Sequence, residues 1–568
     1  MIQGTGSGVG KSILVAAFGR IFKEMGFRVA PFKAQNMALN SAVTADGLEM
    51  GRAQSYQAEA CGLLPDVRMN PILLKPSSDN LSQVILLGRT SGNSNASDYY
   101  SRYLKHRQIA RNAYDELAAE YDLILIEGAG SPAEINLQPR DLVNMQMAHY
   151  AGARVLIVGD IDCGGVFAWM KGTYDLIEYA YKPLVHGFII NKFRGDRSLL
   201  EPGIGMFEQM INLPVLGVIP YFRGIRVDEE DSIPLQALAR EFTADPEQVI
   251  IGVIVPPHIA NFTDFVPLEL EPDVVLRFLR SPAEADLCDC LILPGSKATL
   301  ADARYLSQGW QGQWQAQGQG RAQGGCQSRE QGRAQGQDHP HGEGQQSQGH
   351  GQGGKGQSQG PGQLQCQGWF HRVKSACDRG VAVVGICGGY QMLGEKLFDP
   401  YGVESDIKET EGLGLLPAMT TISLQKVLKQ VNYRTLPSIV FPEALQVTGY
   451  EIHMGQTQVI DQTETIDQTQ TIGQTQIRGR VQPLFDAPDT AVGVMSEDRP
   501  VLGTYIHGIF DNDQARRSFI NWLRQRKGLS PRPAGFSYQL FRQEQLDKLA
   551  AIVREHCDME RITGWLRS

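Results

Sequence analysis

Several features that would place this chain in a membrane, secreted or metal-stabilised class are missing from its 568 residues. No apolar run approaches the ~20 residues that a membrane helix needs, and the chain opens on Met1-Ile2-Gln3-Gly4 instead of a charged and then apolar export signal. The cysteines number 9, are scattered, and include one C-x-C pair, Cys288 and Cys290, without the second cluster of a zinc site. We therefore expect a cytoplasmic protein with reduced, mostly buried thiols.

A large excess of one charge is also lacking. The chain has 53 Lys and Arg against 62 Asp and Glu, a net charge of −9, which argues against a nucleic-acid-binding surface over the whole molecule. Hydrophobic residues make up 42% and charged residues 20%, which excludes a chain disordered throughout, a collagen and a long coiled coil. At about 150 residues for each domain, the length predicts several domains. The lack of a long apolar run predicts no membrane partner.

Short apolar runs alternate with longer mixed stretches, as at 123–126 and 155–158. Such runs are typical of parallel strands that are buried on both faces, with helices as the crossovers. The run 249–255 follows a polar stretch and predicts the first strand of a second sheet. We therefore expect an α/β fold with one domain over 1–245 and another over 246–568.

Two insertions interrupt the second domain. Residues 308–368 contain 20 Gln and 18 Gly, which leaves too little apolar surface to offset the entropy of ordering them. Residues 456–477 include three six-residue repeats that begin at Ile460, Ile466 and Ile472. Three copies are too few for a β-helix, so a disordered surface insertion and a hairpin or loose loop are expected.

A glycine-rich loop, Gly4-Thr5-Gly6-Ser7-Gly8-Val9-Gly10-Lys11-Ser12, stands between a short apolar start and an apolar helix opening. Its N–H groups can face phosphate oxygens, Lys11 adds positive charge, and Ser12 offers a hydroxyl to Mg²⁺. The strict P-loop pattern would have glycine where Thr5 stands, but Gly-Lys-Ser at the helix start is preserved. The loop therefore predicts an ATP or GTP site in preference to a simple glycine turn, with Gly4, Thr5, Gly8, Val9, Gly10, Lys11 and Ser12 as its binding residues.

Carboxylates are needed beside Ser12 if Mg²⁺ is to be held. Glu127 ends the apolar run 123–126 and is well placed, while Asp46 is a second candidate in a turn-like stretch. An isolated acidic residue is more often a cap or turn residue, but the strand-end position favours the functional interpretation for Glu127.

A thiol site is predicted at Cys387. The apolar run 381–386 leads directly into Cys387-Gly388-Gly389, the order of strand, nucleophile, small residues and helix that forms a nucleophile elbow. The helix N-terminus favours thiolate over thiol. An isolated cysteine is usually a core residue, but the flanking glycines reverse that expectation.

Acyl transfer by a thiolate also needs a proton shuttle and donors to an oxyanion. His507, which follows the predicted strand at 503–506, is the best base, and His453 is its rival. Backbone N–H groups near Gly295 and Gly388 are the expected oxyanion donors.

Long strings of the chain resemble the cobyric acid synthase family, the glutamine-hydrolysing amidotransferases of cobalamin biosynthesis. The strings lie at 31–41, 49–54, 70–76, 127–137, 191–196, 293–297, 385–391 and 503–508, and they cover both domains apart from the insertions. The resemblance implies a dethiobiotin-synthetase-like P-loop domain followed by a flavodoxin-like class I glutaminase domain.

The resemblance implies that Cys387 attacks glutamine and that His507 acts as base and acid. It also implies an oxyanion and glutamine-binding region formed by Gly295, Gly388, Tyr390 and Gln391. Ammonia then passes to the first domain, where ATP and Mg²⁺ convert a corrin carboxylate to an acyl phosphate. Carried over by motif, Ser12, Asp46 and Glu127 would hold Mg²⁺. The implied reaction amidates the b, d, e and g side chains of adenosylcobyrinic acid a,c-diamide.

The chain departs from the family pattern in three places. Ile509 stands where most class I glutaminases have Glu, so a Cys–His dyad is implied. Gly8 replaces the usual Asp of the loop, and the chain starts so close to the loop that a clipped first strand is expected. Two alternatives remain: cobyrinic acid a,c-diamide synthase, which shares both modules, and a partitioning-type ATPase switch, whose signature Lys is replaced here by Gly6.

Overall fold

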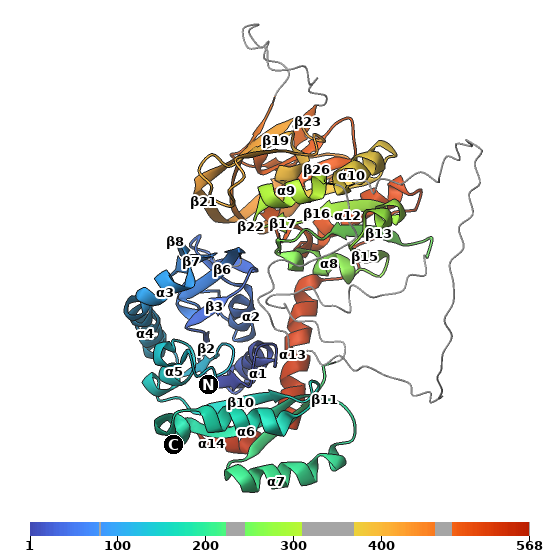
Figure 1. Cartoon of the computed structure of the whole chain (residues 1–568). Coiled ribbons are helices and arrows are strands. Elements are labelled where there is room, and N and C mark those ends of the chain that lie inside the picture. The colour runs from blue at the N-terminus through green and yellow to red at the C-terminus, as the bar shows by residue number, and fades with distance from the viewer. Residues whose placement is uncertain (79–80, 223–244, 309–367, 461–479, 567–568) are drawn as a thin grey trace, which may run out of the picture.

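The computed structural model describes residues 1–78, 81–222, 245–308, 368–460 and 480–566, which form two α/β domains (Figure 1). Of the predicted insertions, only Gln308 and Gly368 of the first and residues 456–460 of the second lie within the described residues. None of the described helices is long and apolar enough to cross a membrane. The predicted α/β class and the order of the two domains are confirmed.

The first domain is built on parallel strands. One sheet has the order β1-β10-β11-β12, and a parallel bridge between Ile2 and Glu127 connects it to the pair β2-β9. The strands are β1 (Ile2–Gly4), β2 (Val29–Phe32), β9 (Leu123–Ile126), β10 (Val155–Asp160), β11 (Val185–Phe193) and β12 (Val215–Pro220). The helices are α1 (Lys11–Glu24), α2 (Arg52–Ala60), α4 (Tyr103–Glu120), α5 (Met145–Tyr150), α6 (Val166–Leu176) and α7 (Glu201–Ile211). Because these strands run parallel, their carboxyl ends place the glycine loop and Glu127 at one edge of the sheet.

A smaller sheet and a hairpin extend the first domain towards the second. The sheet has the order β3-β6-β7-β8 and the hairpin pairs β4 with β5. Their bounds are β3 (Gln35–Met37), β4 (Ser41–Val43), β5 (Glu49–Gly51), β6 (Ile72–Ser78), β7 (Leu81–Leu86) and β8 (Arg89–Ser94). The helix α3 (Ala96–Ser101) follows β8.

The second domain has a sheet of order β15-β13-β16-β18-β26-β25-β23, in which the first five strands are parallel. These strands are β13 (Val249–Ile254), β15 (Val274–Leu279), β16 (Cys290–Leu293), β18 (Ala382–Ile386), β23 (Val481–Pro483), β25 (Gly493–Ser496) and β26 (Val501–Thr504). A second sheet contains β19 (Lys396–Phe398), β20 (Glu409–Glu411), β21 (Ala418–Thr435), β22 (Gln446–Val459) and β27 (Ile506–His507). The flanking helices include α8 (Val266–Glu269), α9 (Thr299–Ser307), α10 (Trp369–Asp378), α11 (Gly388–Leu393) and α12 (Asp513–Arg526).

The chain returns to the first domain at its end. The helix α13 (Tyr538–His556) runs from the second domain along α1, and α14 (Met559–Gly564) follows it (Figure 1). Leu546, Leu549 and Val553 are buried in the same core cluster as α1. Residues from Arg542 onward, which a simple division at 245 assigns to the second domain, therefore pack with the first.

The two ends of the Gln/Gly insertion meet at one point. A Cβ atom on Gly368 would lie only 2.2 Å from the backbone oxygen of Gln308. The insertion thus leaves and re-enters the domain between α9 and α10 without separating these helices.

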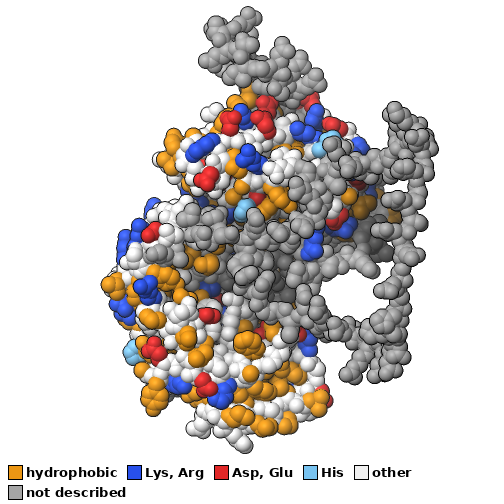
Figure 2. All heavy atoms as spheres, in the orientation of Figure 1, with side chains coloured by type: hydrophobic (Ala, Val, Ile, Leu, Met, Phe, Trp, Pro, Cys, Tyr) orange, Lys and Arg blue, Asp and Glu red, His pale blue; other side chains and the backbone are white. Residues whose placement is uncertain are grey.

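The surface in Figure 2 is uneven in character. Charged side chains are scattered over the second domain, whereas hydrophobic side chains gather on the lower part of the first. The exposed apolar residues of the first domain include Trp169 of α6 and Met206 and Met210 of α7.

Candidate active site

The nucleophile elbow predicted at Cys387 is present. Cys387 lies between β18 and α11 with φ 53° and ψ −110°, a conformation that a residue with a side chain rarely adopts. Such backbone strain costs about 1–3 kcal/mol and persists only where the surroundings enforce it. Here the Cys387 N–H donates to the backbone oxygen of Thr504 at 2.8 Å.

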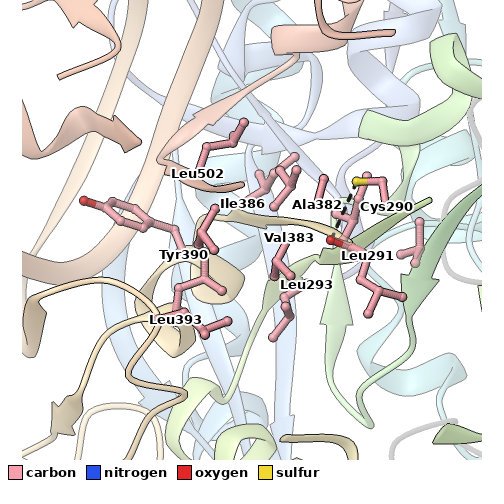
Figure 3. Close-up of a cluster of buried hydrophobic side chains, with 14 of the residues drawn as sticks. Cys290, Leu291, Leu293, Ala382, Val383, Ile386, Tyr390, Leu393 and Leu502 are labelled. Atoms are coloured by element: carbon pink, nitrogen blue, oxygen red, sulfur yellow. Dashed lines mark hydrogen bonds between the residues drawn. The ribbon is translucent and has the colours of Figure 1, made fainter. Parts of the chain in front are cut away.

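Close packing beneath the elbow explains the glycines around it. A Cβ atom on Gly389 would lie 1.9 Å from the backbone oxygen of Leu293, and one on Gly503 would lie 2.0 Å from the ring of Tyr390. Figure 3 shows side chains of β16 and β18 packed with Tyr390 and Leu393 of α11. The helix is thereby held against the sheet, which fixes Cys387 at its N-terminus.

His507 lies beside Cys387, and a carboxylate holds it. His507 Nδ1 is 2.6 Å from Asp264 Oδ2, and both side chains are buried. The backbone N–H of Gly508 donates to the other oxygen of Asp264 at 3.2 Å. The implied dyad is therefore wrong in this respect: a carboxylate replaces the one missing at Ile509, but it comes from the short helix Phe262–Phe265. The one sequence signal was an acidic residue within the apolar stretch 259–268.

The electrostatics favour a protonated His507. Burial opposes the charged imidazolium, but the charges of Asp264 and Cys387 and their hydrogen bonds outweigh it and raise the pKa of His507 to about 10. A protonated imidazole beside Cys387 stabilises the thiolate, which is the nucleophilic form. The pair can therefore carry out acyl transfer.

His453, the rival base, is engaged elsewhere. Its Nδ1 lies 2.7 Å from the backbone oxygen of Gly455, and its Nε2 lies 3.2 Å from a carboxylate oxygen of Glu451. Its ring stacks on Tyr505 with the ring centres 3.7 Å apart. These contacts favour a role in the wall of the site over proton transfer to Cys387.

The residues predicted for the oxyanion and glutamine-binding region lie close to Cys387 and His507, with one exception. A Cβ atom on Gly388 would approach the backbone nitrogen of Ser296 to 2.9 Å, and one on Gly295 would lie 3.5 Å from the His507 ring. Gln391 lines the cavity beside them, and its side-chain oxygen is buried without a hydrogen-bond partner among the described residues. Tyr390 instead lies in the core beneath the elbow, outside the cavity wall.

A cavity of about 60 Å³ opens in front of Cys387. Its wall combines polar and apolar residues and is shared between the domains. The second domain supplies Cys387, His507, Gln391, Lys297, Glu404 and Lys426, and the first supplies Lys75, Gln83 and Asn93. The sequence does not predict Lys75, Lys297 and Glu404 as parts of this site, because nothing in the local pattern brings them to Cys387.

The predicted phosphate loop joins β1 to α1. Gly8 and Gly10 have φ of 72° and 99°, the left-handed region that favours glycine. Lys11 Nζ donates to the backbone oxygens of Gly6 at 2.8 Å and Gly130 at 3.1 Å. Asn191 donates from its side chain to the backbone oxygen of Val9 at 2.8 Å, which anchors the loop to β11. The loop therefore has the curled backbone and the helix N-terminus that bind phosphate groups.

Ser12 and Glu127 are brought together at the loop. Ser12 Oγ donates to Glu127 Oε1 at 2.7 Å, while Lys33 and Gln57 donate to the same carboxylate at 2.9 and 2.6 Å. Burial opposes ionisation of Glu127, but the charge of Lys33 and the hydrogen bonds outweigh it and lower its pKa. A hydroxyl and an ionised carboxylate are suitable ligands for Mg²⁺.

Asp46 does not join this group. It is exposed in the turn of the β4–β5 hairpin, and a Cβ atom on the adjacent Gly47 would lie 2.9 Å from the backbone oxygen of Leu428 in β21. The hairpin therefore faces the second domain. No hydrogen bond or ion pair among the described residues connects Asp46 to Ser12 or Glu127.

Comparisons with known proteins agree with this division of the chain. Residues 1–235 match a family model described as the CobQ/CobB/MinD/ParA nucleotide binding domain. Residues 250–323 and 351–515 match the CobB/CobQ-like glutamine amidotransferase domain. A cobyric acid synthase of Desulfitobacterium hafniense is 41% identical over 578 residues, covering 100% of this chain and 97% of that protein. One of Citrobacter koseri is 42% identical over 570 residues, covering 99% and 97%.

Solved structures are more distant. The structure of PurLQS from Thermotoga maritima matches with a TM-score of 0.28 and 14% identity, covering 49% of this chain and 99% of that one.

Proposed function

The chain belongs to the cobyric acid synthase family, and from that premise we propose that it amidates the b, d, e and g carboxylates of adenosylcobyrinic acid a,c-diamide. It is a glutamine amidotransferase of cobalamin biosynthesis with a nucleotide-binding first domain. The proposal concerns the positions amidated and the residues that act. The positions rest on the similarity of the whole chain to cobyric acid synthases, and the residues that act rest on the cavity at Cys387, whose wall is built from both domains.

In the second domain, Cys387 attacks the side-chain carbonyl of glutamine as the thiolate. The N–H groups near Gly388 and Gly295 stabilise the oxyanion, and His507 gives its proton to the leaving nitrogen, so that ammonia departs and a thioester remains. Water, deprotonated by His507, then hydrolyses the thioester to glutamate. Asp264 orients His507 and stabilises its charged form.

In the first domain, a corrin carboxylate oxygen attacks the terminal phosphate of ATP, giving an acyl phosphate and ADP. Ammonia then displaces phosphate to form the amide. Lys11 and the loop N–H groups hold the transferred phosphoryl group. Ser12 and Glu127 would hold Mg²⁺, which supplies positive charge to the phosphate oxygens when it is bound.

The two half-reactions can be separated by mutation. We expect Cys387→Ala to abolish synthesis with glutamine but to retain synthesis with free ammonia, and Lys11→Ala to abolish synthesis while basal glutamine hydrolysis persists. Mass spectrometry of the corrinoid counts the amidations, since each lowers the mass by about one dalton. Loss of the ammonia-supported reaction in Cys387→Ala would contradict separate sites, and fewer than four amidations would favour the a,c-diamide synthase alternative.

A further inference from the structure

Two ionisable side chains of opposite sign, one basic and one acidic, lie in the wall of the glutaminase cavity. Lys297 and Glu404 both line the cavity that contains Cys387. Within the described part of the chain, neither makes an ion pair. Lys297 Nζ donates to Gln83 Oε1 at 3.3 Å, and Glu404 Oε2 accepts from the backbone N–H of Thr299 at 2.8 Å.

The neighbouring charges at this junction are two lysines and one carboxylate. Glu49 of β5 is completely buried and is paired with Lys75 at 2.8 Å and with Lys426 of β21. These two lysines share a single carboxylate, so Lys297 stands in a region with an excess of positive charge. The cavity therefore offers a place for an anionic group near Lys297.

The titration behaviour of the two groups shows that their mutual attraction does not offset the effect of burial. Burial, and then the nearby Lys75 and Lys426, lower the pKa of Lys297 well below its usual value. Burial raises the pKa of Glu404 to about 7. A bound cation near Glu404 and a bound anion near Lys297 would restore both charged forms.

We propose that Lys297 binds the α-carboxylate and Glu404 the α-ammonium group of L-glutamine, with its side-chain amide at Cys387. An α-amino acid carries both charges on one carbon, so it matches one ammonium and one carboxylate in the same cavity. The unpartnered oxygen of Gln391 provides a further acceptor beside Cys387. This inference rests on the proposed role of Cys387 in glutamine hydrolysis.

One contact also connects this recognition to the first domain. Gln83, which accepts from Lys297, lies in β7 of that domain. The Lys297 side chain, which would bind the carboxylate of glutamine, is therefore positioned by a residue of the first domain. That domain uses the ammonia that glutamine hydrolysis releases.

The test compares substrate analogues on single variants of the full-length protein. Glutaramic acid lacks the ammonium group, and the α-amide of L-glutamine lacks the carboxylate. A hydrogen bond to a charged group contributes about 1.5–3 kcal/mol, so each lost contact should raise KM roughly 10-fold to 150-fold. We expect Lys297→Met to raise KM for L-glutamine by such a factor but to leave KM for the α-amide unchanged. We expect Glu404→Gln to do the same with glutaramic acid as the insensitive substrate.

Several controls keep the test specific. Lys408→Met removes an exposed lysine outside the cavity wall and should change none of the KM values. Lys297→Arg keeps the charge and should retain part of the preference for L-glutamine over its α-amide. Normal ammonia-supported synthesis in each variant reports that the protein is folded.

The results separate this inference from the proposed function. Equal losses on L-glutamine and on the matching analogue, or no loss at all, would overturn the assignment of Lys297 and Glu404 while hydrolysis still depended on Cys387. If Cys387→Ser hydrolysed glutamine at the original rate, the nucleophile itself would be wrong, and the inference would fall with it.

Discussion

The contact between Asp264 and His507 gives the sharpest prediction, because the carboxylate comes from a distant segment. We consider Asp264→Asn, which keeps the size of the side chain and removes its charge. The Nδ1–Oδ2 distance is 2.6 Å, and both partners are buried. An amide in this place can donate to Nδ1, which would put the proton on Nε2 and leave that nitrogen unable to accept one from Cys387.

The expected loss is large. The pKa of His507 is raised from 6.5 to about 10, a difference that corresponds to about 5 kcal/mol in favour of the imidazolium. Asp264 supplies part of it and Cys387 the rest, against the effect of burial. The equivalent change in a serine protease lowers kcat by ~10⁴, so we expect kcat for glutamine hydrolysis to fall by roughly 10²–10⁴.

The pH profile gives an independent readout with a definite sign. With Asp264 in place, His507 keeps its proton until the pH approaches about 10. Without that charge, only Cys387 opposes the effect of burial, so the pKa of His507 falls and the thiolate–imidazolium pair is lost at lower pH. The alkaline limb of glutaminase activity should therefore move to lower pH in Asp264→Asn.

The assay measures glutamate release and, separately, synthesis supported by free ammonia. The exposed Asp406→Asn serves as the matched control and should behave as the unmodified protein. A kcat within twofold of the original, with an unmoved alkaline limb, would refute the role given to Asp264. An equal loss of ammonia-supported synthesis would indicate general misfolding instead.

Three further predictions follow from the geometry. Glu127→Gln should abolish ATP-dependent synthesis. Because it removes the negative charge 2.9 Å from buried Lys33, it should also lower the free energy of unfolding by about 3–5 kcal/mol; an unchanged midpoint in a denaturant titration would contradict this. Gly389→Ala should destabilise the protein strongly, since its methyl group would lie 1.9 Å from a backbone oxygen. Gly172→Ala lies in a helix with open space around it and should stabilise the protein by about 0.5–1 kcal/mol. Equal melting temperatures of these two variants would disprove the packing argument. Replacing residues 309–367 by a short linker should leave turnover nearly intact because the flanking residues adjoin, and a large fall in kcat would show that the insertion takes part in the reaction.

The glycine loop and the elbow could be predicted because each is a local structure. The order of strand, Gly-Lys-Ser and helix fixes the backbone around Lys11, and the glycines beside Cys387 allow the sharp turn at φ 53°. Glu127 was found for the same reason, since a carboxylate at the end of a buried strand lies beside the loops at that edge of the sheet. A family motif alone did not place Asp46 and Tyr390 at the predicted sites. Asp46 lies in an exposed turn, and Tyr390 lies in the core.

The amino-acid sequence alone thus determined the two α/β domains, the phosphate loop, and the identity of Cys387 and His507 as partners. Only the tertiary structure decided that Asp264, which is 243 positions from His507, supplies the third member of the site. It also decided that Lys297 meets Gln83, which is 214 positions away in the other domain. The physical reason is that short patterns encode backbone conformation over a few residues, whereas contacts of this range depend on how sheets and domains pack.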